Sequence, residues 1–343
     1  MMFNPSRSAG ACLLLAASAA AFVAAAPMAA HARTIDTITE NNALSNSTGR
    51  RTVDVGSIAP QKLDPQDVDG VYVFGDSLVD TGNVFNANGG VFPPSPPYFL
   101  GRFSNGPLWI ENILAPLGIN LVPSTTAGGQ NFAFGGAPSG FFLEQPIAPG
   151  GPPPETPGLL YQLGIFTQPA PQVTPQTLYF ISAGSNDLLN DFLANRELDY
   201  NVPVQNLTTA VATLYAYGAR NIVISNIPDL SRAPLTQVNP GELPALKDQI
   251  KLANKYINIA LKDLKKSRPD LNTILLDFYT RFNKFLDAPQ DYGLTNTTSP
   301  CLTAVAVCAN PDEYLFWDEV HPTAAVGQEL AEFFTSTIFT SSP

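Results

Sequence analysis

Residues 71–83 read Val71-Tyr72-Val73-Phe74-Gly75-Asp76-Ser77-Leu78-Val79-Asp80-Thr81-Gly82-Asn83, and this stretch decides the fold. Its first four residues are apolar, mostly β-branched or aromatic, and predict a short buried strand. The Gly-Asp-Ser that follows predicts a sharp turn into a helical segment, which puts Ser77 at a strand-to-helix junction. A serine there suits a nucleophile, because its own N–H and the helix dipole favour a developing oxyanion. The alternative is that Ser77 only caps a helix.

Four further segments have the character of buried strands, and they alternate with amphipathic helical patterns. The strands are expected at 121–123, 177–183, 221–227 and 273–278, and the helices at 108–117, 204–217, 242–266 and 323–339, the first with Ser104 or Asn105 as its cap. Nearly continuous apolar strands that alternate with helices indicate a parallel sheet covered on both faces. We therefore predict an α/β protein, a three-layer α/β/α sandwich with about five parallel strands. Ligands bind beyond the carboxyl ends of such strands, where Ser77, Gly136 and Asn186 all fall.

The N-terminus has the pattern of a secretory signal. Arg7 precedes an apolar run from Cys12 to Ala26, and Ala30-His31-Ala32 has the A-x-A form of a signal-peptidase site. We expect residues 1–32 to be removed by cleavage near Ala32, which places the protein in the periplasm or outside the cell. The alternative, a membrane anchor, is disfavoured because the run is shorter than the roughly 20 residues that a span needs. Residues 33–67 are polar and aperiodic and predict a loosely ordered leader, so 68–343 is the expected folded domain.

Charge and cysteine content narrow the function further. The 343 residues include 18 basic and 29 acidic side chains, for a net charge of −11. This balance argues against nucleic-acid binding and against electrostatic docking to anionic lipid. Once the signal is removed, Cys301 and Cys308 are the two cysteines left, and in an oxidising compartment such a pair is more often a disulfide than two thiols.

A second chemical motif lies just before the last predicted helix. Asp318 and His321 are three residues apart in Phe316-Trp317-Asp318-Glu319-Val320-His321-Pro322-Thr323. On a helical turn this spacing puts both side chains on one face, where a carboxylate can hold one imidazole nitrogen and leave the other free as a base. The alternative is that Asp318 is a helix-start acid and His321 a packed surface histidine. Together with Ser77 and with glycine and asparagine donors, however, the pair completes what acyl transfer needs.

Five motifs in one order resemble the GDSL family of the SGNH-hydrolase superfamily, particularly its secreted branch of plant GDSL lipases and bacterial lecithinase/haemolysin-like phospholipases. They are G-D-S-L-V-D-T-G-N at 75–83, G-R-F-S-N-G at 101–106, N-F-A-F-G-G-A at 131–137, G-S-N-D at 184–187 and F-W-D-x-x-H-P-T at 316–323. The resemblance implies a flavodoxin-like fold with Ser77 as the nucleophile, His321 as the general base and acid, and Asp318 as its orienting partner. It further implies an oxyanion hole made by Ser77, Gly136 and Asn186, although Gly135 also fits the family's glycine. Asp80, Asn83 and Asp187 are then structural.

The implied function is a secreted esterase or lipase that hydrolyses carboxylic esters, of lipids or other acyl compounds, through an acyl-enzyme on Ser77. We expect no cofactor and no metal, because this chemistry requires neither and one histidine remains after cleavage. One alternative is an acyltransferase that uses the same acyl-enzyme, and another is a non-catalytic surface- or carbohydrate-binding protein. The sequence does not decide the acyl length, the alcohol part of the substrate or the oligomeric state.

Overall fold

The sheet is parallel, as predicted, and has four strands. In the computed structural model, which describes residues 60–142, 155–168 and 173–341, the strands follow the order β1-β2-β3-β4. Their bounds are Val71–Gly75 for β1, Leu178–Ser182 for β2, Asn221–Ser225 for β3 and Asn272–Leu276 for β4. One row of the register runs Val73, Phe180, Val223 and Ile274. The predicted signal and residues 33–59 of the predicted leader lie outside the described residues.

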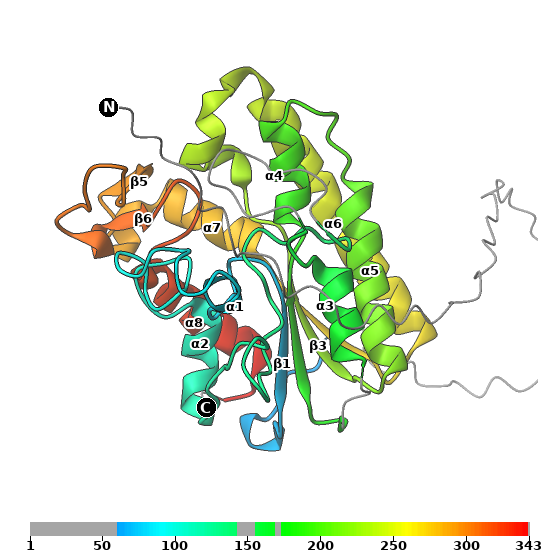
Figure 1. Ribbon diagram of the computed structural model, residues 1–343. Helices are drawn as coiled ribbons and strands as arrows, with labels where there is room; N and C mark the ends of the chain where they lie inside the picture. Colours follow the sequence, from blue (N-terminus) through cyan, green and yellow to red (C-terminus); the bar gives the residue numbers. More distant parts are fainter. Residues whose placement is uncertain (1–59, 143–154, 169–172, 342–343) are drawn as a thin grey trace, which may run out of the picture. The chain divides into compact units, whose positions relative to one another are not determined.

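Helices cover both faces of the sheet and make the three-layer sandwich that the sequence predicts (Figure 1). The helices are α1 Asn83–Ala87, α2 Trp109–Leu114, α3 Leu159–Phe166, α4 Ser185–Leu193, α5 Asn201–Ala216, α6 Leu243–Ser267, α7 Phe278–Asp287 and α8 Ala324–Ile338. One face packs against α3, α5 and α6, and the other against α2, α7 and α8. Because side chains alternate along a strand, Val73 enters one core and Phe74 the other. Both faces are apolar, which is why these strands appear as continuous apolar runs.

The predicted strand at 121–123 is wrong, since residues there form only an isolated bridge between Pro123 and Asn131. The chain instead turns back at Val122, whose carbonyl accepts the N–H groups of Gln130 and Asn131. Residues 130–134 then run beside β1, where Val73 donates to the Gln130 carbonyl and Phe132 donates to the Val73 carbonyl. The free edge of β1 is therefore covered by the glycine motif, which brings that motif next to Ser77.

Two smaller predictions also need correction. Residues 60–67 are not a loose leader, because Leu63 bonds through its backbone to Ile338 and Thr340 at the end of α8 and packs on the core. The predicted caps of α2 are wrong as well, since its N-cap is Leu108, while the Asn105 side chain accepts the N–H of Ala324 at the start of α8. Both errors have the same origin, because the hydrogen-bond partner of Leu63 and that of Asn105 each lie more than 200 residues away in the sequence.

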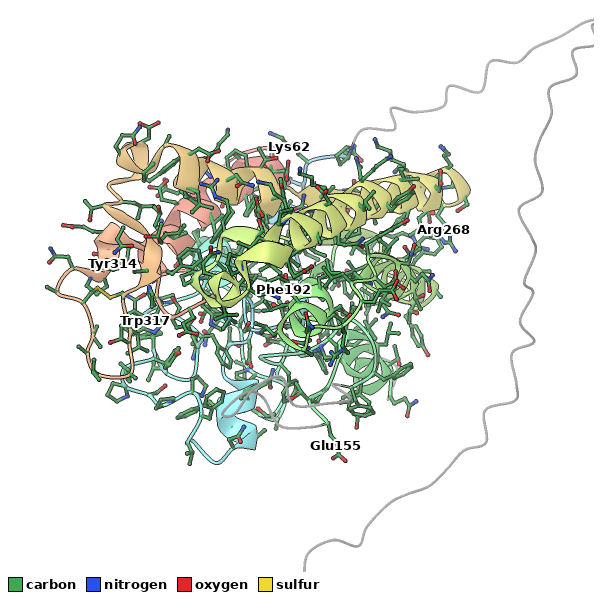
Figure 2. The ribbon with its side chains drawn as sticks, turned by 90° about the horizontal axis from the view of Figure 1, so that it is seen from above. Lys62, Glu155, Phe192, Arg268, Tyr314 and Trp317 are labelled. Carbon is green, nitrogen blue, oxygen red and sulfur yellow. A yellow bond between two sulfur atoms is a disulfide. The ribbon has the colours of Figure 1, made fainter. Side chains whose placement is uncertain are left out.

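A second, two-stranded sheet lies outside the main one and carries the Asp318–His321 motif at its end. Its strands β5 (Asn296–Pro300) and β6 (Tyr314–Phe316) are parallel, and the disulfide between Cys301 and Cys308 closes the loop after β5. Figure 2 shows Trp317, the residue after β6, near Tyr314 and far from Arg268 at the end of α6. In the part of the chain that the structure describes, no helix is both long and apolar enough to cross a membrane.

Candidate active site

The structure brings Ser77, His321 and Asp318 into one hydrogen-bonded line. Ser77 Oγ lies 2.8 Å from His321 Nε2, and His321 Nδ1 lies 2.7 Å from Asp318 Oδ2. An ionised carboxylate only accepts hydrogen bonds, so Nδ1 carries the ring proton and Nε2 faces the serine hydroxyl as an acceptor. This is the arrangement in which an imidazole can take a proton from a serine. Ser77 and His321 are 244 positions apart in the sequence, and the sheet and the loop after β6 bring them together.

Ser77 sits in a turn and not, as the sequence predicted, at the N-terminus of a helix. The side-chain carboxylate of Asp76 accepts the N–H of Leu78, and the backbone carbonyl of Asp76 accepts the N–H of Val79. These two bonds close the turn directly after β1. Helix α1 starts only at Asn83, where the Asp80 carboxylate accepts the N–H groups of Gly82 and Asn83. The helix that does begin at this edge of the sheet is α4, with Asn186 in its first turn.

The predicted oxyanion residues line one cleft together with Ser77 and His321. Among the described residues, the N–H groups of Ser77 and Gly136 have no hydrogen-bond acceptor. Asn186 Nδ2 donates to the Ala137 carbonyl (2.9 Å), which uses one of its two N–H groups. The N–H of Gly135, in contrast, donates to Asp80. Donors without partners are therefore available at Ser77, Gly136 and Asn186, and not at Gly135.

Two glycines in this motif meet steric needs of the site. A Cβ on Gly135 would lie 2.2 Å from the Phe103 ring, so a side chain there would displace an aromatic wall of the cleft. Gly136 has φ of 78°, in the left-handed region that glycine adopts readily. This conformation supports the turn that leaves the Gly136 N–H unpaired.

Asp318 lies in an irregular loop and not on a helical turn, which corrects the predicted local structure. Its Oδ1 accepts the N–H groups of Val320 (2.9 Å) and His321 (2.8 Å), and these bonds make the short turn that points both side chains the same way. Burial alone would raise the pKa of Asp318, but its attraction to His321 and the hydrogen bonds from His321 and Val320 outweigh burial and lower it. The carboxylate is therefore ionised beside the imidazole.

Three other buried acids hold the loops around Ser77. Asp80 accepts N–H groups from the turn before α1 and from Gly135, and Asp187 accepts both the N–H and the hydroxyl of Ser139. Burial raises the pKa of Asp76 to about 7 and those of Asp80 and Asp187 to about 6, against the lowering effect of their hydrogen bonds. None of these three carboxylates has a basic side chain as a hydrogen-bond partner among the described residues.

The cleft above the serine has a volume of about 510 Å³ and a largely apolar wall. Its lining includes Leu189 and Leu193 of α4, Leu302 of the disulfide loop, and the aromatic rings of Phe92 and Phe103. Its described lining holds Asp318 and Glu319 but no lysine or arginine. A smaller cavity of about 50 Å³ also reaches Ser77 and His321. In the described ranges, no group of three histidine, cysteine, aspartate or glutamate side chains could hold a metal ion.

The sequence missed one side chain in the line of the candidate triad, the hydroxyl of Tyr98. It donates to Asp318 Oδ2 at 2.8 Å, the oxygen that also faces His321. The local signal is that Tyr98 lies three residues before G-R-F-S-N-G, a motif for which the sequence predicted only a helix cap at Ser104 or Asn105. Nothing in the spacing connects Tyr98 with an aspartate 220 residues later.

Comparison with known proteins identifies relatives of similar sequence. A "thermolabile hemolysin" of Vibrio parahaemolyticus is 28% identical over 79% of this chain, and the match spans 64% of the haemolysin's length. A GDSL esterase/lipase of Arabidopsis thaliana is 28% identical over 77% of this chain and 81% of its own. A phosphatidylcholine-sterol acyltransferase of Aeromonas hydrophila is 26% identical over 76% of this chain and 85% of its own.

The family model for GDSL-like lipases and acylhydrolases matches residues 71–334, which includes every motif quoted above. This match confirms the predicted class of enzyme, a carboxylic ester hydrolase. The chain belongs to the GDSL-like lipase/acylhydrolase family.

Proposed function

We propose that this protein is a secreted serine esterase or lipase whose nucleophile is Ser77. The observation that carries the proposal is the line from Ser77 Oγ through His321 to Asp318, beside three groups with unpaired N–H donors. A serine, a base held in one tautomer and an oxyanion site are the three parts that acyl transfer requires.

The reaction has two steps. Ser77 Oγ attacks the ester carbonyl carbon while its proton passes to His321 Nε2, and the carbonyl oxygen becomes an oxyanion. The C–O bond to the alcohol then breaks, and the alcohol leaves with the proton from His321. Water attacks the resulting acyl-enzyme and gives a proton to His321, which returns it to Ser77 Oγ as the carboxylic acid departs. Asp318 holds Nδ1 and stabilises the imidazolium that forms in both steps.

The oxyanion would be held by the N–H groups of Ser77 and Gly136 and by the second N–H of Asn186. The engagement of the Gly135 N–H by Asp80 supports Gly136 as the glycine donor. The N-terminus of α4 adds its dipole at the same place. Donors fixed in advance in this way stabilise the transition state without reorganisation.

The cleft supports an ester with an apolar portion and without negative charge. Its wall is largely leucine and aromatic side chains, and the charged groups in its described lining are carboxylates. An anionic substrate would meet Glu319, and the described lining has no lysine or arginine to balance the two charges. We therefore propose that the substrate is a neutral or zwitterionic ester, such as a lipid ester.

Transfer of the acyl group to an alcohol in place of water is the second candidate activity. The match to a phosphatidylcholine-sterol acyltransferase favours it, and both activities use the same acyl-enzyme. Product analysis with and without added sterol separates them, because transfer gives a new ester and hydrolysis gives the free acid.

We further propose that the signal at 1–32 directs export and that the disulfide between Cys301 and Cys308 forms in the oxidising compartment that the chain then reaches. Mass spectrometry of the exported protein should find Arg33, or a residue close to it, at the N-terminus. A mature mass equal to that of the full chain would contradict cleavage.

An organophosphonate that mimics the tetrahedral intermediate tests the nucleophile. It should label Ser77 with loss of ester hydrolysis, and the Ser77→Ala variant should be neither labelled nor active. Ser185 is the matched control, because it also lies just beyond a strand end, after β2, and lines the smaller cavity of about 50 Å³. Labelling that persists in Ser77→Ala and disappears in Ser185→Ala would overturn the assignment.

A further inference from the structure

Residues 98–105 contact the loop of the candidate base and the start of α8 at four points. The Tyr98 hydroxyl donates to Asp318, and the Phe103 ring lies 5.2 Å, centre to centre, from that of His321. The Ser104 hydroxyl donates to the carbonyl of Pro322 at 2.9 Å, and the Asn105 side chain accepts the N–H of Ala324 at 2.8 Å. Contacts in the same order on both segments are what a clamp needs, because they fix the loop along its length.

The clamping segment is itself held firmly. Arg102 forms an ion pair with Glu111 of α2 at 2.7 Å, and the second Glu111 oxygen accepts the N–H of Leu108. The Phe99 N–H donates to the Ser104 carbonyl, which closes the segment into a turn. Gly101 leaves no room for a side chain, since a Cβ there would lie 2.6 Å from Phe85. Residues 98–105 thus connect α2 with the loop of His321 through direct contacts on both sides.

Tyr98 acts on the charge of the pair as well as on its position. Its hydroxyl and His321 Nδ1 approach the same oxygen, Asp318 Oδ2, at 2.8 and 2.7 Å. Asp318 therefore accepts four hydrogen bonds, two on each oxygen, and has no freedom to rotate. A second donor on Oδ2 stabilises the carboxylate and weakens its pull on the imidazolium. Burial, together with the charge of Asp318 and the bond to it, raises the pKa of Tyr98, so the phenol stays a donor.

We propose that residues 98–105 are a clamp for the Asp318–His321 pair and that Tyr98 is a positioning residue that sets the orientation and the proton affinity of that pair. The inference rests on the proposed function, since it assigns a role in the same reaction. It also gives a role to the G-R-F-S-N-G motif, whose Phe, Ser and Asn make three of the four contacts.

The test compares Tyr98→Phe with Tyr215→Phe. Both substitutions remove one tyrosine–aspartate hydrogen bond and keep the ring. Tyr98 is part of the cleft lining, whereas Tyr215 bonds Asp270 at 2.7 Å and is not among the residues that line the cleft. We expect Tyr98→Phe to lower kcat for a p-nitrophenyl ester about 10-fold with little change in KM, as loss of a hydrogen bond to a charged group predicts. Tyr215→Phe should match the parent.

Two readouts separate positioning from simple support of the fold. Without the Tyr98 donor, Oδ2 attracts the imidazolium more strongly, so the rise of kcat/KM with pH should move to higher pH. The low-field proton resonance of the Asp318–His321 bond should move as well, and His321 is the sole histidine among the described residues. Asp76 and Glu319 are the other charged groups that face the pair or Tyr98, and both stay unchanged in the variant.

The results distinguish failure of this proposal from failure of the proposed function. If Tyr98→Phe loses activity but keeps the parent's pH profile and proton resonance, or if it matches Tyr215→Phe throughout, Tyr98 does not set the pair, and the inference is wrong. Activity that survives in Ser77→Ala would instead overturn the function on which the inference rests.

Discussion

The two halves of the candidate site are built by different means. The serine half follows directly from the sheet, because Ser77 and Asn186 lie just beyond the ends of β1 and β2, and backbone bonds to Asp76 and Asp80 shape the turn. The base half lies in a loop after β6, outside the main sheet, and is positioned by side chains from residues 98–105. A parallel sheet can place a nucleophile by its own geometry, whereas a loop needs contacts from elsewhere in the chain to place a base.

The pKa values of buried carboxylates are also shifted in opposite directions in the two halves. Asp76, Asp80 and Asp187 bind mainly backbone N–H groups, so burial dominates and raises the pKa of each. Asp318 is buried too, yet the neighbouring His321 and several hydrogen bonds lower its pKa. Asp318 therefore contributes stability above its unfolded pKa that is lost as the pH falls, while the other three acids favour the fold when they are protonated.

The largest expected effect removes the base half. His321→Ala leaves Ser77 without a proton acceptor, and kcat should fall by roughly 10⁵- to 10⁶-fold. Ester hydrolysis measured beside Ser77→Ala should show nearly equal losses, and the double variant should be no worse, because the two residues act as a unit. Losses that multiply in the double variant would mean that serine and histidine act in separate reactions.

The second prediction concerns the buried acids of the serine half. Between pH 4 and 7 the unfolded chain ionises at position 76 while the folded chain holds the proton, so stability falls as the pH rises and levels off above about 7. Asp76→Asn removes this loss, which is on the order of 4 kcal/mol for a pKa raised from 3.8 to about 7.

Urea unfolding of parent and Asp76→Asn from pH 4 to 8, followed by tryptophan fluorescence, measures the difference. Asp248→Asn is the control, because the Asp248 side chain is 73% exposed. This substitution should leave the pH dependence of the unfolding free energy unchanged. Parallel stability profiles of the parent and Asp76→Asn would show that Asp76 is not protonated in the fold.

The third and smallest effect concerns the oxyanion donors. Asn186→Ala should lower kcat by about 10²- to 10³-fold, or about 3 kcal/mol of transition-state stabilisation, with a smaller change in KM. Asn190→Ala is the matched control, one helical turn further along α4 and also in the cleft lining, and its kcat should stay near that of the parent. Equal effects of the two substitutions on kcat would remove Asn186 from the oxyanion site.

Most of the fold was predictable from local patterns. The four strands of the sheet and the helices α5, α6 and α8 lie within a few residues of their predicted bounds, because period and composition report burial directly. The prediction of a strand at 121–123 was wrong because a short apolar run does not reveal that the chain turns back at Val122. Helix α7 and the pair β5–β6 were also missed; α7 follows β4 after one residue, Asp277, which caps it.

By itself, the sequence determined the parallel α/β/α class, the enzyme family and the identities of Ser77, His321 and Asp318 as candidates, because strand periodicity and motif order are local properties of a chain. The tertiary structure alone decided that Ser77 sits in an Asp76-closed turn, that Gly135 is engaged by Asp80 while Gly136 is free, and that Tyr98 reaches Asp318. Each of these depends on one or two hydrogen bonds, and for Gly135 and Tyr98 the partner lies 55 and 220 residues away. Pairings of that kind arise only when the sheet and its loops have packed.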